Sequence, residues 1–230
     1  MRIWTYTEAK TKVLNDLDLS QDGFVTSQEL IDLFNEGIDE AEAEIHKTHE
    51  DYFLKRGLIE LVSGTQDYAL PEDIYANKIR KMFYVNGSER YKVKKLRRMS
   101  GLEIYEDELA YGTQTNWLRY LITNDAATGP RISFVPVPLV DGEFIKIWYL
   151  RNATRIVDGT ESLDIPEFAN FVMTYVKAKI KEKMNGGVMP ADQAALVQQQ
   201  RDMMVSTLEN MIEDDDDEVE MDLSIYEEHS

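Results

Sequence analysis

Oxygen-bearing side chains recur between Asp18 and Leu30, in the stretch DLSQDGFVTSQEL, at the spacing of an EF-hand calcium loop. Such a loop of about twelve residues takes ligands from positions 1, 3, 5, 7 and 12 and has a glycine at position 6. Gly23 stands at position 6. The predicted ligands are the side chains of Asp18, Ser20, Asp22 and Glu29 and the carbonyl of Phe24. Ca2+ is therefore the one cofactor for which the sequence holds candidate ligands.

The same stretch also has the features of a plain corner between two helices. Thr26 and Glu29 have the spacing of a capping box, in which each side chain accepts a hydrogen bond from the other residue's backbone amide. Gly23 suits the turn, and the chain holds no second loop of this pattern. We favour the helix corner and keep calcium binding as the alternative.

A second group of charged residues lies between Lys78 and Arg98, where basic side chains oppose the charge of the rest of the chain. Alternate residues of a strand share a face, so we expect Lys92 and Lys94 on one side and Tyr91, Val93 and Lys95 on the other. The cluster is interpreted as the solvated face of a hairpin, as a docking surface for an acidic protein such as a neighbour's EDDDDE segment, or, third, as a nucleic-acid site. The candidate docking patch comprises Arg90, Lys92, Lys94, Lys95, Arg97 and Arg98.

Composition restricts the function classes further. The chain has 230 residues, of which 43% are apolar, so it can build a sizeable core. Its net charge of -18 repels phosphate backbones and anionic membranes. It has no cysteine, no GxSxG, no P-loop, no GxGxxG and no HExxH. No apolar run approaches the roughly 20 residues that span a bilayer. We therefore expect a protein that is made in a cytoplasm. We do not expect it to be an enzyme.

The elements that must position these residues form an α+β pattern. Apolar residues recur at helical spacing over 5–17, 26–49, 164–185 and 190–212, and short runs of β-formers fill 52–157. Asn86-Gly87 predicts a hairpin, and Pro136 and Pro138 predict that their strand lies at the edge of a sheet or ends there. We predict one domain over 1–212, with a helical core and an inserted, mostly antiparallel β-sheet.

Two further groups of apolar residues are expected to pack against other surfaces. In EFIKIWYLR, the residues Ile145, Ile147 and Tyr149 share one face of a strand, and we expect this face to pack on the helices. The segment 213–230 is an acidic arm whose charge run cannot bury itself. Its spaced apolar residues, which we expect to dock on a surface outside the arm, are Met221, Leu223, Ile225 and Tyr226.

Several stretches, in order along nearly the whole chain, resemble the head-to-tail adaptor (head completion) proteins of tailed bacteriophages. They are TYTEAKTKVLNDLDL, YALPEDIYANKIRKMFYVNGS, GEFIKIWYLR, DIPEFANFVMTYVK and QQQRDMMVSTLENMI. The resemblance implies a structural virion protein of the neck, made in the host bacterial cytoplasm. It implies that this chain forms a ring, which is twelve-fold in that family, bound to the portal protein and to a tail or nozzle protein, with DNA passing through the lumen. The apolar residues of the arm would then dock on the portal or on a neighbouring subunit. It implies no membrane partner.

Two function hypotheses therefore stand. The first is a connector-ring subunit, and the second is a calcium-binding regulatory module that engages a basic target through its acidic helices. A closed ring supports the first hypothesis, whereas a calcium-dependent monomer supports the second.

Overall fold

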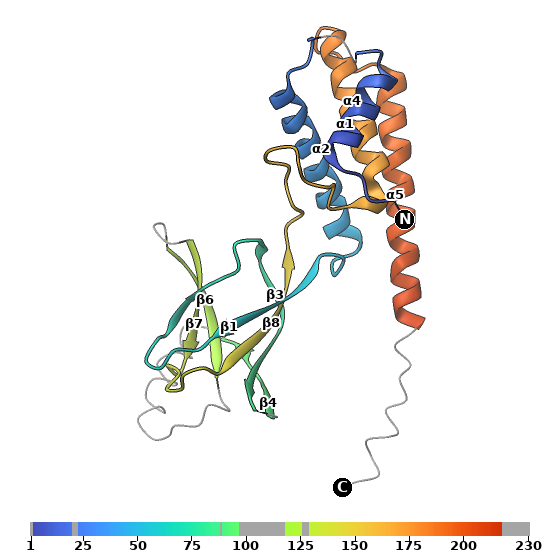
Figure 1. Ribbon diagram of the computed structural model, residues 1–230. Helices are drawn as coiled ribbons and strands as arrows, with labels where there is room; N and C mark the ends of the chain where they lie inside the picture. The colour runs from blue at the N-terminus through green and yellow to red at the C-terminus, as the bar shows by residue number, and fades with distance from the viewer. Residues whose placement is uncertain (1, 20–22, 88, 97–117, 126–128, 218–230) are drawn as a thin grey trace. The chain divides into compact units, whose positions relative to one another are not determined.

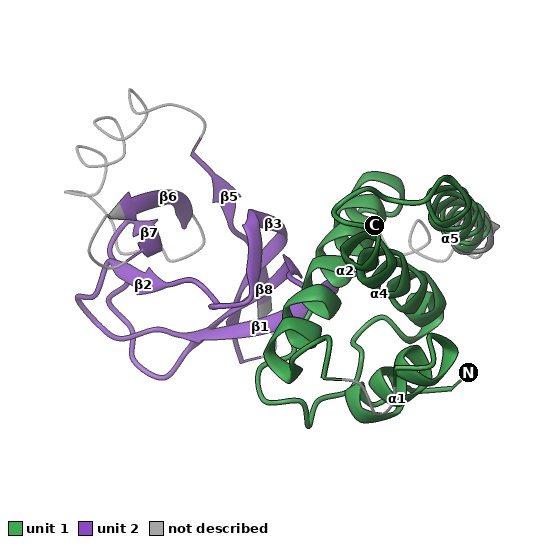
Figure 2. Cartoon of the chain, turned by 90° about the horizontal axis from the view of Figure 1, so that it is seen from above, with its two compact units in different colours: residues 1–52, 153–230 green, residues 53–152 purple. Residues whose placement is uncertain are grey.

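The computed structural model describes residues 2–19, 23–87, 89–96, 118–125 and 129–217. These residues group into two compact units, drawn in different colours in Figure 2. Unit 1 comprises 1–52 and 153–230, and unit 2 comprises 53–152. The β-rich insertion expected over 52–157 is thus compact in its own right, and the assignment of one domain over 1–212 stays a prediction.

Unit 1 contains the helices α1 (Tyr6–Asp16), α2 (Ser27–Thr48), α4 (Ala169–Met184) and α5 (Ala191–Asp217), and the short 3-10 helix η3 (Pro166–Phe168). The Thr5 side chain begins α1 by accepting a hydrogen bond from the Glu8 amide, and the Glu8 carboxylate accepts one from the Thr5 amide. This capping box was not predicted. At the other end of the bundle, Gly186 follows α4 at a φ of 69°, which favours glycine and stops the helix.

The helices of unit 1 pack through the apolar stripes that their spacing predicts. Phe34, Ile38 and Ile45 of α2 are fully buried, as are Val172 and Ile180 of α4. The two helices approach closely where α2 carries Gly37, because a Cβ at that position would lie 3.2 Å from Cγ1 of Val172. Figure 1 shows α5 running alongside this pair, and its residues Met204 and Leu208 are buried. The α+β class and the predicted helical core are confirmed.

The described strands of unit 2 form two four-stranded sheets rather than the single sheet expected. The first has the order β1-β8-β3-β4 and the second the order β2-β7-β6-β5. All pairings are antiparallel except that between β5 and β6. The strands are β1 (Leu54–Glu60), β2 (Asp67–Ala69), β3 (Ile74–Asn86), β4 (Glu89–Lys92), β5 (Lys94–Lys95), β6 (Arg119–Asp125), β7 (Gly129–Val135) and β8 (Phe144–Arg151).

The predicted turn signals are found in the sheets. The hairpin at Asn86-Gly87 joins β3 to β4, with Asn86 opposite Glu89 and Gly87 at a φ of 58°. Strand β7 ends at Val135, immediately before Pro136, because proline cannot donate to the ladder.

The face formed by Ile145, Ile147 and Tyr149 is buried, but the expectation that it packs on the helices is wrong. These residues belong to the core of unit 2 together with Met82 of β3 and Phe134 of β7. Both sheets contribute to that core, so a second sheet supplies the cover that we expected from helices. Phe144, on the opposite face of β8, is 40% exposed.

Two predicted boundaries differ at the chain's end. Helix α5 was expected to stop at 212 but continues to Asp217, so the first residues of the predicted arm are helical.

Among the helices of the described residues, none combines the length and the apolar character needed to cross a bilayer.

Candidate functional site: a basic groove and an acidic corner

A groove lined by basic side chains lies at one edge of unit 2, where β3, β4, β5 and β6 meet. Its volume is about 510 Å³. The six basic side chains that line it are Arg80, Lys81, Lys92, Lys94, Lys95 and Arg119, and the remaining lining residues are Met82, Val93 and Tyr120. The groove therefore combines a cationic rim with a small apolar floor.

A bend at Val93 builds this groove. Val93 lies between β4 and β5, is buried, and donates its backbone N–H to the carbonyl of Met82 at 3.0 Å. After this residue the chain leaves the first sheet and pairs with β6 of the second, where Lys94 lies opposite Arg119. One continuous stretch of chain thus presents lysines to both sheets.

The predicted alternation holds only up to the bend. Lys92 and Lys94 are exposed and Val93 is buried, as expected, but Lys95 is also exposed instead of sharing the buried side of Val93. The lysines Lys81, Lys92, Lys94 and Lys95 make no ion pair with the carboxylates that the structure describes. Arg90 lies on β4 outside the groove lining, and Arg97 and Arg98 lie outside the described residues.

The acidic corner between α1 and α2 binds a cation from the protein itself. The ammonium Nζ of Lys183, near the end of α4, lies 2.7 and 2.8 Å from the two carboxylate oxygens of Glu29. It also donates to the carbonyl of Phe24 at 3.1 Å and lies 4.8 Å from the centre of the Phe24 ring. Two of the predicted calcium ligands therefore hold a lysine.

Asp18, the first predicted ligand, has a structural role that the sequence did not reveal. It follows α1 at a φ of 56°, a left-handed conformation that aspartate tolerates better than most residues. Its N–H donates to the carbonyl of Asn15, and the N–H of Leu19 donates to that of Leu14 at 2.9 Å. These are the two hydrogen bonds of a Schellman motif, which ends the helix.

The other predicted ligands leave the calcium question open. Ser20 and Asp22 lie outside the described residues. Among the residues that are described, no three or more His, Asp or Glu side chains gather as metal ligands. The predicted capping box forms by half: Thr26 accepts the N–H of Glu29 at 3.1 Å, while the Glu29 carboxylate binds Lys183. Calcium binding thus stays a prediction.

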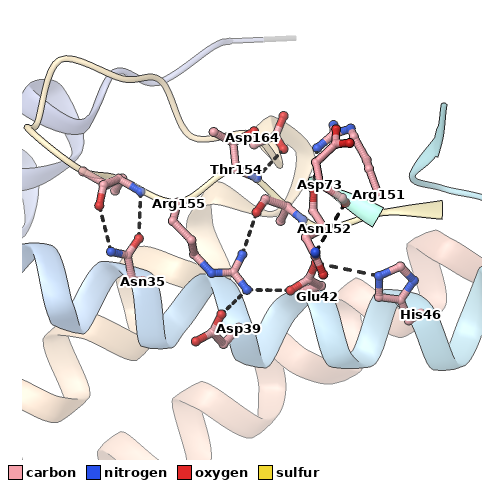
Figure 3. A network of polar contacts seen from close by, with 12 residues as sticks. Asn35, Asp39, Glu42, His46, Asp73, Arg151, Asn152, Thr154, Arg155 and Asp164 are labelled. Atoms are coloured by element: carbon pink, nitrogen blue, oxygen red, sulfur yellow. Dashed lines mark hydrogen bonds and ion pairs between the residues drawn. The ribbon is translucent and has the colours of Figure 1, made fainter. Parts of the chain in front are cut away.

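A buried polar network within unit 1 attaches the segment that follows unit 2 to helix α2 (Figure 3). The carboxylate of Glu42, a side chain almost fully buried, accepts the N–H of Ala153 and a guanidinium N–H of Arg155, both at 2.6 Å. Arg155 also pairs with Asp39. The side-chain amide of Asn35 both accepts from and donates to the backbone of Ile156, at 2.8 and 2.9 Å. This network fixes the start of 153–165 on the helical bundle.

Sequence reasoning missed this network, because it did not single out Glu42 among the many carboxylates of α2. Its neighbours in space are more than a hundred residues away in sequence. The signal available in the sequence was its place on α2 beside the apolar residues Ala41 and Ile45. The predicted docking residues Met221, Leu223, Ile225 and Tyr226 lie outside the described residues.

Comparison with models of protein families gives a match over nearly the whole chain. The model of a family described as the SU10 adaptor protein matches residues 4–223. The matched range contains every described helix and strand of both units. No curated protein matches the chain.

Proposed function

Because the chain belongs to the SU10 adaptor protein family, we propose that it forms a ring that joins the portal of a bacteriophage head to the tail. The chain is a structural adaptor protein of a phage. The family match over 4–223 is the observation that carries the proposal, since it spans both compact units in their order along the chain. Ring formation and attachment to the portal and the tail are the parts of this proposal that go beyond the family match.

The net charge of -18 supports the passage of DNA through such a ring. An acidic lumen repels the duplex, so DNA slides without the phosphate contacts that would retain it. In this proposal the DNA is a passing cargo, while the binding partners are copies of this chain, the portal protein and a tail or nozzle protein. The place of the protein is the neck of the virion.

The architecture of unit 1 supports a role in assembly rather than in catalysis. Helix α5 has 27 residues, yet among those whose burial is described the buried apolar ones are only Met204 and Leu208. The apolar side chains of Leu196 and Met203 on the same helix are 45% and 56% exposed. Exposed apolar side chains on a long helix offer contact area to a neighbouring subunit. The sequence carries no catalytic motif that would suggest a reaction.

Attachment to the portal is tested by removing residues 218–230, which contain the predicted docking residues of the arm. Because all described helices end by Asp217, the shortened chain should keep the melting temperature of the full chain. The full chain should co-sediment with portal particles, whereas the shortened chain should not. Co-sedimentation equal to that of the full chain would contradict the assignment of the arm to portal binding.

A further inference from the structure

We propose that the basic groove of unit 2 binds the acidic run Glu213–Asp217 of a second copy of this chain. The proposal rests on the proposed ring for the choice of a second copy, and on the groove itself for the chemistry of the ligand. The groove is defined by its lining between Arg80 and Tyr120.

The lining of the groove favours an anionic ligand. Its volume of about 510 Å³ is large enough to hold several side chains of a partner. Four of its lysines make no ion pair with described carboxylates, although the chain carries 43 acidic residues and only 25 basic ones. Such a concentration of like charges repels itself, and an anionic partner removes that repulsion.

The C-terminal end of α5 carries negative charge that its own helix does not neutralise. The sequence there reads EDDDD, and the last turn of the helix contains no basic residue. The C-terminal end of a helix carries a partial negative charge, so carboxylates are unfavourable there and cations are favourable. Neighbouring carboxylates on one helix also repel one another. The run therefore gains from a cationic surface that lies outside its own helix.

A ring needs two different surfaces on each subunit, one for each neighbour, because its contacts are heterologous. The groove belongs to unit 2 and the acidic run to unit 1, so each subunit carries both halves of the contact. DNA is the less suitable ligand, because a chain with a net charge of -18 repels phosphate backbones. The groove and the run together give the contact a direction around the ring.

The ligand class is tested with a labelled peptide that has the sequence of residues 211–222, MIEDDDDEVEMD. The receptor is the full chain in which Asp214, Asp215, Asp216 and Asp217 are changed to Asn, so that its own run does not compete. We expect binding that weakens as ionic strength rises from about 0.1 M to about 1 M, because the Debye length falls from roughly 10 Å to roughly 3 Å.

Charge reversal locates the peptide. Lys92→Glu with Lys94→Glu should weaken binding at least about tenfold, since two exposed attractions become repulsions. The matched control is Lys12→Glu with Lys47→Glu, which changes the net charge equally at exposed lysines of unit 1 and should leave binding unchanged. Absence of peptide binding, or equal loss in both variants, would overturn the proposal. So would binding of a short DNA duplex, but not the peptide, by the groove.

Cross-linking distinguishes a second copy from the same chain, and the chain has no native cysteine to interfere. A chain with both Lys94→Cys and Asp216→Cys should give a ladder of covalent multimers on oxidation, whereas Lys47→Cys with Asp216→Cys should not. A cross-linked product of monomer mass, or none, would overturn the second-copy assignment. If the wild-type chain forms a closed ring but the groove does not bind the peptide, only this inference is refuted. If the groove binds the peptide but the chain forms no ring, only the proposed function is refuted.

Discussion

At the scale of single residues, the acidic corner shows how one local pattern fits two chemistries. The spacing from Asp18 to Glu29 matches a calcium loop, but Asp18 ends a helix and Glu29 binds Lys183. Caps and turns depend on neighbouring residues and were therefore predictable. The lysine is 154 residues away from Glu29 in the sequence, so no local spacing could reveal it.

If Lys183 is the cation of this corner, calcium and chelator should leave the melting temperature of the wild-type chain unchanged. Lys183→Met should lower the free energy of unfolding by about 0.5–1 kcal/mol, the value of an exposed ion pair. The matched control is Lys181→Met on the same helix, which leaves the Glu29 pair intact and should cost less. Heat released on titrating calcium into wild type, and lost in Glu29→Gln, would instead establish the calcium loop.

Asp73 in unit 2 gives a pH dependence whose sign follows from its contacts. Burial alone raises the pKa of Asp73, but hydrogen bonds from Lys55 at 2.7 Å and from the Tyr149 hydroxyl at 2.8 Å outweigh it, so the pKa lies below its ordinary value. The carboxylate therefore contributes stability above its unfolded pKa of 3.8, and this contribution is lost as the pH falls through the lower folded value.

Asp73→Asn should accordingly lower the melting temperature at pH 7 and flatten its decline at acid pH. The measurement is thermal unfolding of wild type and variant across the acid range, with Asp67→Asn as a carboxylate control elsewhere in the same unit. Parallel acid profiles for wild type and Asp73→Asn would show that this carboxylate does not carry the dependence.

At the scale of elements, periodicity predicted the helices and the hairpin but not the division of the strands into two sheets. The apolar spacing of α2 and α4 is local and decides which face is buried. By contrast, the change of sheet at Val93 depends on a hydrogen bond to Met82 and on pairing with β6. The sequence alternates across the bend much as it would in one continuous strand, so the groove that the bend creates could not be predicted.

Glu42 tests the interpretation that the segment after unit 2 is fixed to α2 by buried polar contacts. Glu42→Gln should lower the free energy of unfolding of unit 1 by about 1–3 kcal/mol, because a charged acceptor of two hydrogen bonds is replaced. Glu44→Gln, two residues further along the helix, removes a pair with the exposed Lys47 and should cost only about 0.3–0.5 kcal/mol. Chemical denaturation measures both, and equal costs would contradict this role.

At the scale of the whole molecule, several stretches that resemble head-to-tail adaptor proteins predicted the family, which no single motif could do. The family match covers the helices, both sheets and the start of the arm, and it agrees with the head-to-tail adaptor expected from the sequence. The surfaces that we propose for assembly, the basic groove and the exposed side of α5, follow from charge and exposure and not from periodicity.

The central claim is that this chain closes into a ring on the portal. Negative-stain imaging of the purified chain mixed with portal protein tests it most directly, with portal alone as the control. The account predicts end-on views of a closed ring with an open centre, stacked coaxially on the portal in side views. Portal particles without added density, beside a chain that remains monomeric at every concentration used, would contradict it.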